Sequence, residues 1–175
     1  MAEQYRIQYG VPVTVLRSSW VFEHDDLLNH FSLLRNVNPA EAGHGFGEVT
    51  DDVLALVRAG KERIPILTDV HGTPLCRHIL HADDLMQAFD RALGNPSAIG
   101  RTFNIAGPSP FDYGVAATYL SGKLGVPTVD LRCPKYHSFG INITCARTVL
   151  GYAPENDFFR MADRAIEWRN APKSS

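Results

Sequence analysis

The chain has 175 residues, of which 45% are hydrophobic and 21% charged, as in an ordinary globular protein with a core of its own. Its formal net charge of -2 gives no general attraction to nucleic acid or anionic membranes, and no apolar run is long enough to span a bilayer. Three cysteines without paired spacing favour free thiols in a reducing cytoplasm.

The first half of the chain alternates helix and strand signals. The expected elements are a helix end at residues 5–9, a strand at 11–17, a loop at 18–24, a helix at 25–34, a helix at 51–59 and a strand at 64–67. Gly10 is placed to stop the first helix, and Thr50 to cap the helix that follows it. The apolar, β-branched run at 11–17 is typical of a strand buried on both faces.

The second half continues the same alternation. The expected elements are a helix that runs from residue 84 or 85 to 92, a strand at 102–106, a helix at 111–124, a strand at 128–132, a short helix at 144–150 and a helix at 157–169. Asp83 is the expected cap of the first of these helices, with Leu85, Met86, Phe89 and Ala92 on its buried face. We expect one domain over residues 1–170 and a disordered tail at 171–175.

Four stretches, read in order, carry a family resemblance: Tyr9–Arg17, Arg77–Leu85, Gly100–Gly107 and Ala146–Pro154. In that order and spacing the chain resembles the carboxyl-terminal half of an extended short-chain dehydrogenase/reductase. That is the NAD-dependent epimerase/dehydratase family, which acts mostly on nucleotide sugars. The resemblance implies an α/β fold, the carboxyl-terminal part of a Rossmann-like fold, with two parallel core strands, a small substrate-binding subdomain and helices packed around them.

Two parts of that family's machinery are absent from the sequence. The family binds its dinucleotide on a glycine-rich turn after the first strand. The nearest candidate, Gly43–Gly47, lacks the spacing and the preceding strand, and reads as a loop. The catalytic Tyr-x-x-x-Lys pair is also missing, and the chain looks as though it begins just beyond it. Tyr119 and Lys123 have the right spacing, but they lie on an amphipathic helix and read as a half-buried Tyr and a solvated Lys. We therefore assign no catalytic residue. NAD or NADP is implied by the resemblance, and neither is expected to bind this chain tightly on its own.

The resemblance also implies a substrate site. Arg77 matches an Arg that grips the substrate diphosphate in sugar-nucleotide members, and Arg132 matches a second Arg there. Lys135 stands where the family often has an Asp that contacts the nucleoside. Two guanidinium groups and an ammonium would favour a phosphate-bearing or otherwise anionic ligand. Surface ion pairing is the alternative for both arginines.

A further implied site follows the strand at 11–17, because ligands bind at the carboxyl ends of strands in open α/β sheets. The resemblance places Trp20 against substrate, and Ser19, Val21 and His24 against the cofactor. Trp20 departs from the Asn of the family pattern, and His24 from its Pro. The alternative is that Trp20 and Phe22 are core or interface aromatics.

We expect no metal site. The chelating side chains near residue 80 fit no standard zinc spacing, and the resemblance explains them as strand-end and cap positions; they are Cys76, His78, His81, Asp83 and Asp84.

Three functional hypotheses remain open, one of them a degenerate fragment with no activity. The chain is the substrate-binding, nucleotide-sugar-type portion of an NAD(P)-dependent epimerase/dehydratase-like protein, inactive alone; or it is a stand-alone binding or interaction module for an anionic small molecule or a protein partner. The strand at Val11–Arg17 would have one bare edge, so we expect a homodimer through it and the Met1–Tyr9 helix, or a missing amino-terminal half in its place. No nucleic-acid or membrane partner is expected.

Overall fold

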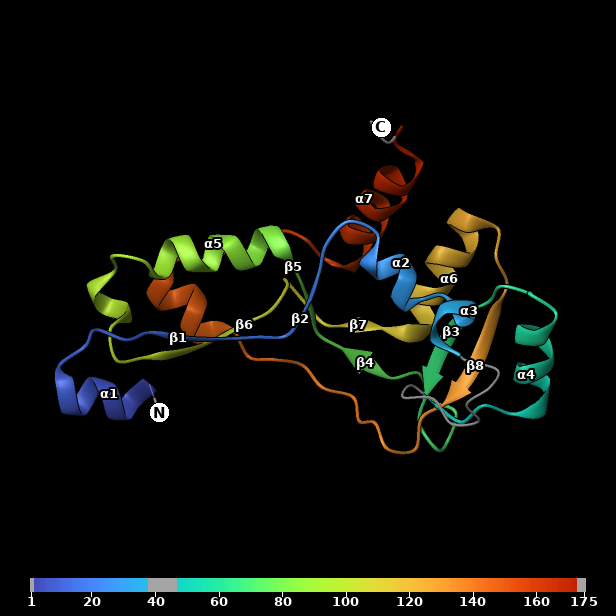
Figure 1. Cartoon of the computed structure of the whole chain (residues 1–175), viewed down its shortest axis with the longest axis horizontal. Coiled ribbons are helices and arrows are strands. Elements are labelled where there is room, and N and C mark those ends of the chain that lie inside the picture. Colours follow the sequence, from blue (N-terminus) through green and yellow to red (C-terminus); the bar gives the residue numbers. More distant parts are fainter. Residues whose placement is uncertain (1, 38–46, 173–175) are drawn as a thin grey trace. The chain divides into compact units, whose positions relative to one another are not determined.

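The computed structural model describes residues 2–37 and 47–172 (Figure 1). The chain divides into two compact units. Unit 1 comprises Met1–Phe22, His78–Pro110 and Gly140–Asp157, and unit 2 comprises Glu23–Arg77, Phe111–Phe139 and Phe158–Ser175. The expectation of one domain over residues 1–170 stays a prediction, and each unit is described by itself. The Gly43–Gly47 loop and the tail at 171–175 lie largely outside the described residues.

Unit 1 is built on two short parallel ladders. Its elements are α1 (Ala2–Tyr9), β1 (Val15–Ser18), β2 (Trp20–Phe22), β5 (Ile79–His81), α5 (Ala82–Ala92), the 3-10 turn η1 (Pro96–Ala98), β6 (Thr102–Ile105) and the π-helical turn η2 (Ala146–Leu150). β1 pairs with β6, and β2 with β5, so both ladders join segments far apart in the sequence. The parallel pairing expected between the strands near residues 15 and 103 is confirmed.

The core of unit 1 lies between these ladders and α5. Phe103 and Ile105 of β6 are fully buried with Leu80 of β5 and Ala88 of α5, and Tyr152 closes the cluster beside η2. α5 packs against β1, β2 and β5, and it is the helix drawn along the β1–β6 ladder in Figure 1. Covering helices of this kind are what a parallel ladder needs, because both of its faces are apolar.

The structure corrects two expectations in unit 1. The strand at 11–17 begins only at Val15 and is not buried on both faces, since Arg17 and Ser18 are exposed. The helix expected to begin at residue 84 or 85 begins two or three residues earlier, at Ala82. Its cap is His81 and not Asp83, because the His81 ring Nδ1 accepts the Asp83 backbone N–H at 3.1 Å. The inward face of the helix also differs from the expected one. Asp84 and Ala88 are buried in α5, whereas Met86 and Phe89 are exposed.

Unit 2 combines one parallel and one antiparallel ladder. Its elements are α2 (Asp26–His30), α3 (Leu33–Asn36), α4 (Asp51–Arg58), β3 (Ile64–Thr68), β4 (Cys76–Arg77), β7 (Phe111–Asp112), α6 (Tyr113–Leu124), β8 (Thr128–Arg132) and α7 (Phe158–Asn170). β3 pairs with β8 in parallel, and β4 pairs with β7 in antiparallel. Together the two units confirm a mixed α/β fold with parallel strand pairs.

Aromatic rings fill much of the unit 2 core. Phe31, Phe111, Tyr113 and Phe158 lie with neighbouring ring centroids 4.8–6.0 Å apart, in tilted and edge-to-face arrangements. Such pairs add to the stability that the buried area alone gives. Because Phe31 must enter this cluster, the single helix expected over 25–34 is broken there. α2 ends at His30, and the Ser32 hydroxyl then caps α3 by accepting the Arg35 N–H.

Candidate functional site

Arg77 lies on β4, in a segment of unit 2 that is held on two sides. β4 pairs with β7, with Arg77 opposite Phe111. On the other side, the Cys76 N–H donates to the Ser138 hydroxyl at 2.9 Å, and the Phe139 N–H donates to the Cys76 carbonyl at 3.2 Å. The segment 136–139 is therefore fixed alongside the strand that carries Arg77.

The Arg77 guanidinium is enclosed by that segment. The side chain is 3% exposed, and Nη1 donates to the His137 carbonyl oxygen. The guanidinium carbon lies 5.1 Å from the centroid of the Tyr136 ring and 4.9 Å from that of Phe139. Among the described residues no carboxylate forms an ion pair with Arg77. A buried cation without a counter-charge is unfavourable, and an anion that reached it would gain a charge-assisted bond.

The charge of Arg77 is felt by the groups packed near it. Burial, and next the Arg77 charge, lower the pKa of His30 to about 4. Burial raises the pKa of Cys133 to about 11, with Arg77 opposing the rise. Burial likewise raises the pKa of Tyr113, again against the effect of Arg77. Burial therefore disfavours charge of either sign in this part of unit 2, while the Arg77 charge adds to the cost of a second cation and reduces the cost of an anion.

Arg132 is the last residue of β8, and Lys135 lies between β8 and the 136–139 segment. Both side chains are exposed. Arg132 Nη1 lies 3.8 Å from Glu48 Oε2, so part of its charge is already balanced at the surface. Lys135 directly precedes the 136–139 segment that encloses Arg77, whereas Arg132 is paired with Glu48.

Ser19, Trp20 and Val21 belong to unit 1, at the carboxyl end of β1. The Ser19 N–H donates to the Ile105 carbonyl at 3.0 Å, which extends the β1–β6 pairing by one residue. The Ser19 hydroxyl oxygen is buried and has no hydrogen-bond partner among the described residues. Trp20 and Val21, which the sequence placed in a loop, form β2 and are 47% and 40% exposed.

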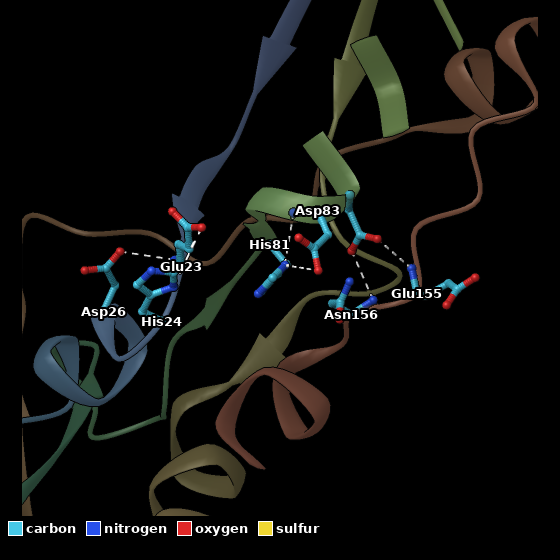
Figure 2. Close-up of polar contacts among 8 residues, drawn as sticks. Glu23, His24, Asp26, His81, Asp83, Glu155 and Asn156 are labelled. Atoms are coloured by element: carbon cyan, nitrogen blue, oxygen red, sulfur yellow. Dashed lines mark hydrogen bonds and ion pairs between the residues drawn. The ribbon is translucent and has the colours of Figure 1, made fainter. Parts of the chain in front are cut away.

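His24 belongs to unit 2 and has an unusual backbone. Its φ of 50° is in the left-handed region, which residues other than glycine seldom adopt. Its ring stacks on Trp168 of α7, with centroids 4.8 Å apart, and Nδ1 lies 3.7 Å from Glu23 Oε1. Figure 2 shows this turn, in which the Glu23 N–H donates to Asp26 Oδ2 at 3.1 Å. The strained backbone and the stack on Trp168 fix where the His24 ring lies.

The start of α5 in unit 1 contains a buried carboxylate that the sequence did not single out. Asp84 is 2% exposed, and its two oxygens accept the N–H groups of Glu155 and Asn156, each at 3.0 Å (Figure 2). Asp84 therefore holds the 155–156 segment against the first turn of α5. The neighbouring His81 caps that same turn by accepting the Asp83 N–H.

The pair Tyr119 and Lys123, which has the spacing of the family's catalytic pair, makes structural contacts. Lys123 Nζ and the Tyr119 hydroxyl both bind Asp163 Oδ1, at 2.9 and 2.8 Å, so this pair ties α6 to α7. Within residues 2–37 and 47–172, no three His, Cys, Asp or Glu side chains are grouped to hold a metal ion. No helix in the same residues is both long and apolar enough to cross a bilayer.

The fold is that of about half of a short-chain dehydrogenase/reductase. A structure of a short-chain dehydrogenase/reductase superfamily protein from Agrobacterium tumefaciens with bound NAD matches 95% of this chain and 53% of its own, with a TM-score of 0.79 and 20% identity. UDP-glucuronic acid 4-epimerase from Bacillus cereus, in complex with UDP-glucuronic acid and NAD, matches 95% and 48%, with a TM-score of 0.64 and 18% identity. dTDP-glucose 4,6-dehydratase from Bacillus anthracis, in complex with NAD, matches 97% and 49%, with a TM-score of 0.65 and 18% identity. The chain spans about half the length of these proteins. No protein-family model and no curated protein sequence matches it.

Proposed function

We propose that the chain is the substrate-binding portion of an NAD(P)-dependent epimerase/dehydratase-like protein, and that its ligand is of the nucleotide-sugar type. Two independent lines support this proposal. The sequence motifs around Arg77, Gly100 and Ala146 resemble that family, and the fold matches half of an NAD-bound epimerase and half of an NAD-bound dehydratase. The chain alone carries out no turnover under this proposal, because it has neither the glycine-rich turn nor the Tyr-x-x-x-Lys pair.

The observation that carries the proposal is the state of Arg77. Its guanidinium is buried, it is held by a backbone carbonyl and two aromatic rings, and it has no carboxylate partner among the described residues. A diphosphate would supply the missing negative charge, and its oxygens could accept two parallel N–H hydrogen bonds from the Arg77 guanidinium. Arg132 and Lys135 would add positive charge in unit 2, and Trp20, which belongs to unit 1, is assigned to the substrate by the family pattern alone.

The residues at the carboxyl end of β1 fit the cofactor only in part. The partnerless buried hydroxyl of Ser19 is a polar group that a bound molecule would satisfy, which agrees with a role beside the cofactor for Ser19 and Val21. His24 is assigned there by the family pattern alone. The sequence has no glycine-rich turn of the family's spacing to hold the pyrophosphate, so these residues do not make up a complete NAD(P) site.

Titration calorimetry with inorganic pyrophosphate and with UDP-glucuronic acid tests the role of Arg77. Arg77→Gln should weaken binding about 10-fold or more, which corresponds to about 1.4 kcal/mol. Arg58→Gln, on the exposed end of α4, is the matched control, and Lys123→Ala on α6 a second one; both should bind as the unaltered chain does. Equal losses in Arg77→Gln and Arg58→Gln, with both variants folded by circular dichroism, would overturn the assignment.

The competing function is a stand-alone module that binds an anionic small molecule or a protein partner. The DNA directly upstream of the Met1 codon discriminates between the two. An in-frame glycine-rich turn and Tyr-x-x-x-Lys pair would support the enzyme, whereas a stop codon followed by a ribosome-binding site would support the module. A cytoplasmic location stays a prediction under either function.

A further inference from the structure

The Arg77 guanidinium, which the proposed function assigns to a phosphate group, is covered by the chain itself. Arg77 is 3% exposed, and its Nη1 already donates to the His137 carbonyl oxygen. The centroids of the Tyr136 and Phe139 rings lie 5.1 and 4.9 Å from its guanidinium carbon. A ligand as large as a diphosphate can reach a guanidinium enclosed in this way only if part of the surrounding chain moves.

The segment Tyr136–Phe139 forms no helix or strand and is fastened to β4 at one residue, Cys76. The Cys76 N–H donates to the Ser138 hydroxyl at 2.9 Å, and the Phe139 N–H donates to the Cys76 carbonyl at 3.2 Å. Phe139, which covers Arg77, is itself 45% exposed. Irregular, partly exposed segments of this kind open locally at a lower free energy than strands of the core.

The other segment at Arg77, β4, is fixed within the core of unit 2. It pairs with β7, and the residue that precedes it, Leu75, is bonded on both its backbone groups. The Leu75 N–H donates to the Leu67 carbonyl at 2.8 Å, and the Leu75 carbonyl accepts the Tyr113 N–H at 3.0 Å. Leu75 and Tyr113 are almost fully buried. Of the two segments that meet at Arg77, the exposed one is therefore the one that can move.

A phosphate group would replace the contacts that such a movement breaks. In the free protein the Arg77 charge is stabilised by the His137 carbonyl dipole and the faces of two aromatic rings. A phosphate oxygen carries a full negative charge, and its hydrogen bonds to a guanidinium are shorter and stronger than those of a neutral carbonyl. The same guanidinium is thus held by its own chain when the site is empty and by the ligand when the site is filled.

We propose that the segment Tyr136–Phe139 is a gate over Arg77, closed in the free protein and released from β4 when a diphosphate or another phosphate-bearing ligand binds. The nature of the ligand rests on the proposed function, whereas the enclosure of Arg77 does not. Because only the open form accepts the ligand, the apparent affinity is reduced by the fraction of molecules in that form. A substitution that loosens the gate should therefore tighten binding, whereas the loss of a ligand contact would weaken it.

Titration calorimetry with inorganic pyrophosphate tests this sign. Ser138→Ala removes the hydroxyl that accepts the Cys76 N–H and leaves both rings in place, and Phe139→Ala removes one ring. Each variant should bind pyrophosphate about 3-fold or more tightly than the unaltered chain. Phe159→Ala, on a 41% exposed aromatic residue of α7, is the matched control and should bind as the unaltered chain does.

Amide hydrogen exchange, measured by NMR in the unaltered chain with and without saturating pyrophosphate, tests the movement itself. The Phe139 amide should exchange about 10-fold or more rapidly when the ligand is bound, because its bond to the Cys76 carbonyl is broken. The Leu75 amide should stay protected in both samples and reports that unit 2 remains folded. Arg77→Gln combined with Phe139→Ala should bind no more tightly than Arg77→Gln alone, which ties the gain in affinity to the uncovered guanidinium.

The outcomes separate the gate from the proposed function. Pyrophosphate binding that leaves the Phe139 amide protected would refute the gate and leave the role of Arg77 intact. Unchanged or weaker binding in Ser138→Ala and Phe139→Ala, with the Leu75 amide protected, would also refute the gate. Absence of binding to the unaltered chain and to both gate variants would refute the proposed function, and the gate with it.

Discussion

His30 Nε2 lies 2.7 Å from the Tyr113 hydroxyl oxygen, inside unit 2. Burial lowers the pKa of His30 to about 4, with help from the Arg77 charge, and burial raises the pKa of Tyr113. At neutral pH the two side chains are therefore an uncharged, hydrogen-bonded pair. The pair packs against Phe31, whose ring centroid lies 5.3 Å from that of His30 and 5.4 Å from that of Tyr113.

This pair predicts a loss of stability in acid. The pKa of His30 is 6.5 without its folded surroundings and about 4 within them, so the unfolded state binds more protons between those pH values. The free energy of unfolding should therefore fall as the pH drops from 6.5 to 4, by roughly 3 kcal/mol at most from this group. His78, whose pKa burial also lowers, adds to the fall. Urea unfolding at pH 7.0, 5.5 and 4.5 measures this fall in the free energy of unfolding.

Two variants isolate the contribution of His30. His30→Gln should be less stable than the unaltered chain at pH 7 but should lose less stability on acidification. His71→Gln, in the exposed turn after β3, should keep the full pH dependence. The same dependence in His30→Gln as in the unaltered chain would show that His30 does not titrate abnormally.

Asp84 predicts a second effect on stability. Its carboxylate accepts two backbone N–H groups from Glu155 and Asn156 while almost fully buried. Asp84→Asn replaces one acceptor by an NH2 group that faces a donor, and should cost about 2–4 kcal/mol. The side chain of the preceding residue, Asp83, is largely exposed, so Asp83→Asn should change the free energy of unfolding by about 0.5 kcal/mol or less. Thermal and urea unfolding of both variants check this, and equal losses would contradict the role given to Asp84.

The elements that local signals specify were predictable from the sequence. Thr50 caps α4 as expected, its hydroxyl accepting the Val53 N–H. Gly10 and Gly151 end α1 and η2 with φ values of 66° and 67°, which glycine adopts without strain. The shortest strands were not predictable, because β2 and β4 have only three and two residues and exist through their partners.

The surroundings of the candidate site were harder to predict than its central residue. Arg77 was identified from the pattern around it, but the carbonyl that holds it, that of His137, lies 60 residues away along the chain. No local signal links the two. Asp84 was missed for a different reason: two aspartates at a helix start look alike in sequence. Asp84 turns inward, where its partners Glu155 and Asn156 lie, whereas the Asp83 side chain is largely exposed.

The chain alone is predicted not to bind NAD or NADP with micromolar affinity. Backbone N–H groups of a glycine-rich turn are the family's pyrophosphate contacts, and this sequence has no such turn. Ser19, Val21 and His24, which the family pattern places beside the cofactor, do not replace such a turn. Isothermal titration with each cofactor is the measurement. A micromolar dissociation constant for either one would disprove the prediction and would require a phosphate site elsewhere in the chain.

Two glycines predict opposite effects of the same substitution. A Cβ on Gly107 would lie 2.9 Å from the Ile79 carbonyl oxygen and 3.4 Å from that of Asn156. Both are backbone atoms, which cannot rotate away as a flexible side chain can. Gly107→Ala should therefore destabilise the fold by about 1–3 kcal/mol, the usual cost of overpacking. Gly122 lies within α6 and has nothing within 4 Å of an added Cβ, so Gly122→Ala should stabilise the chain by roughly 0.5–1 kcal/mol through helix propensity. Urea unfolding of the two variants decides the matter, and a change of the same sign in both would mean that the approach of Gly107 to β5 is looser than the structure indicates.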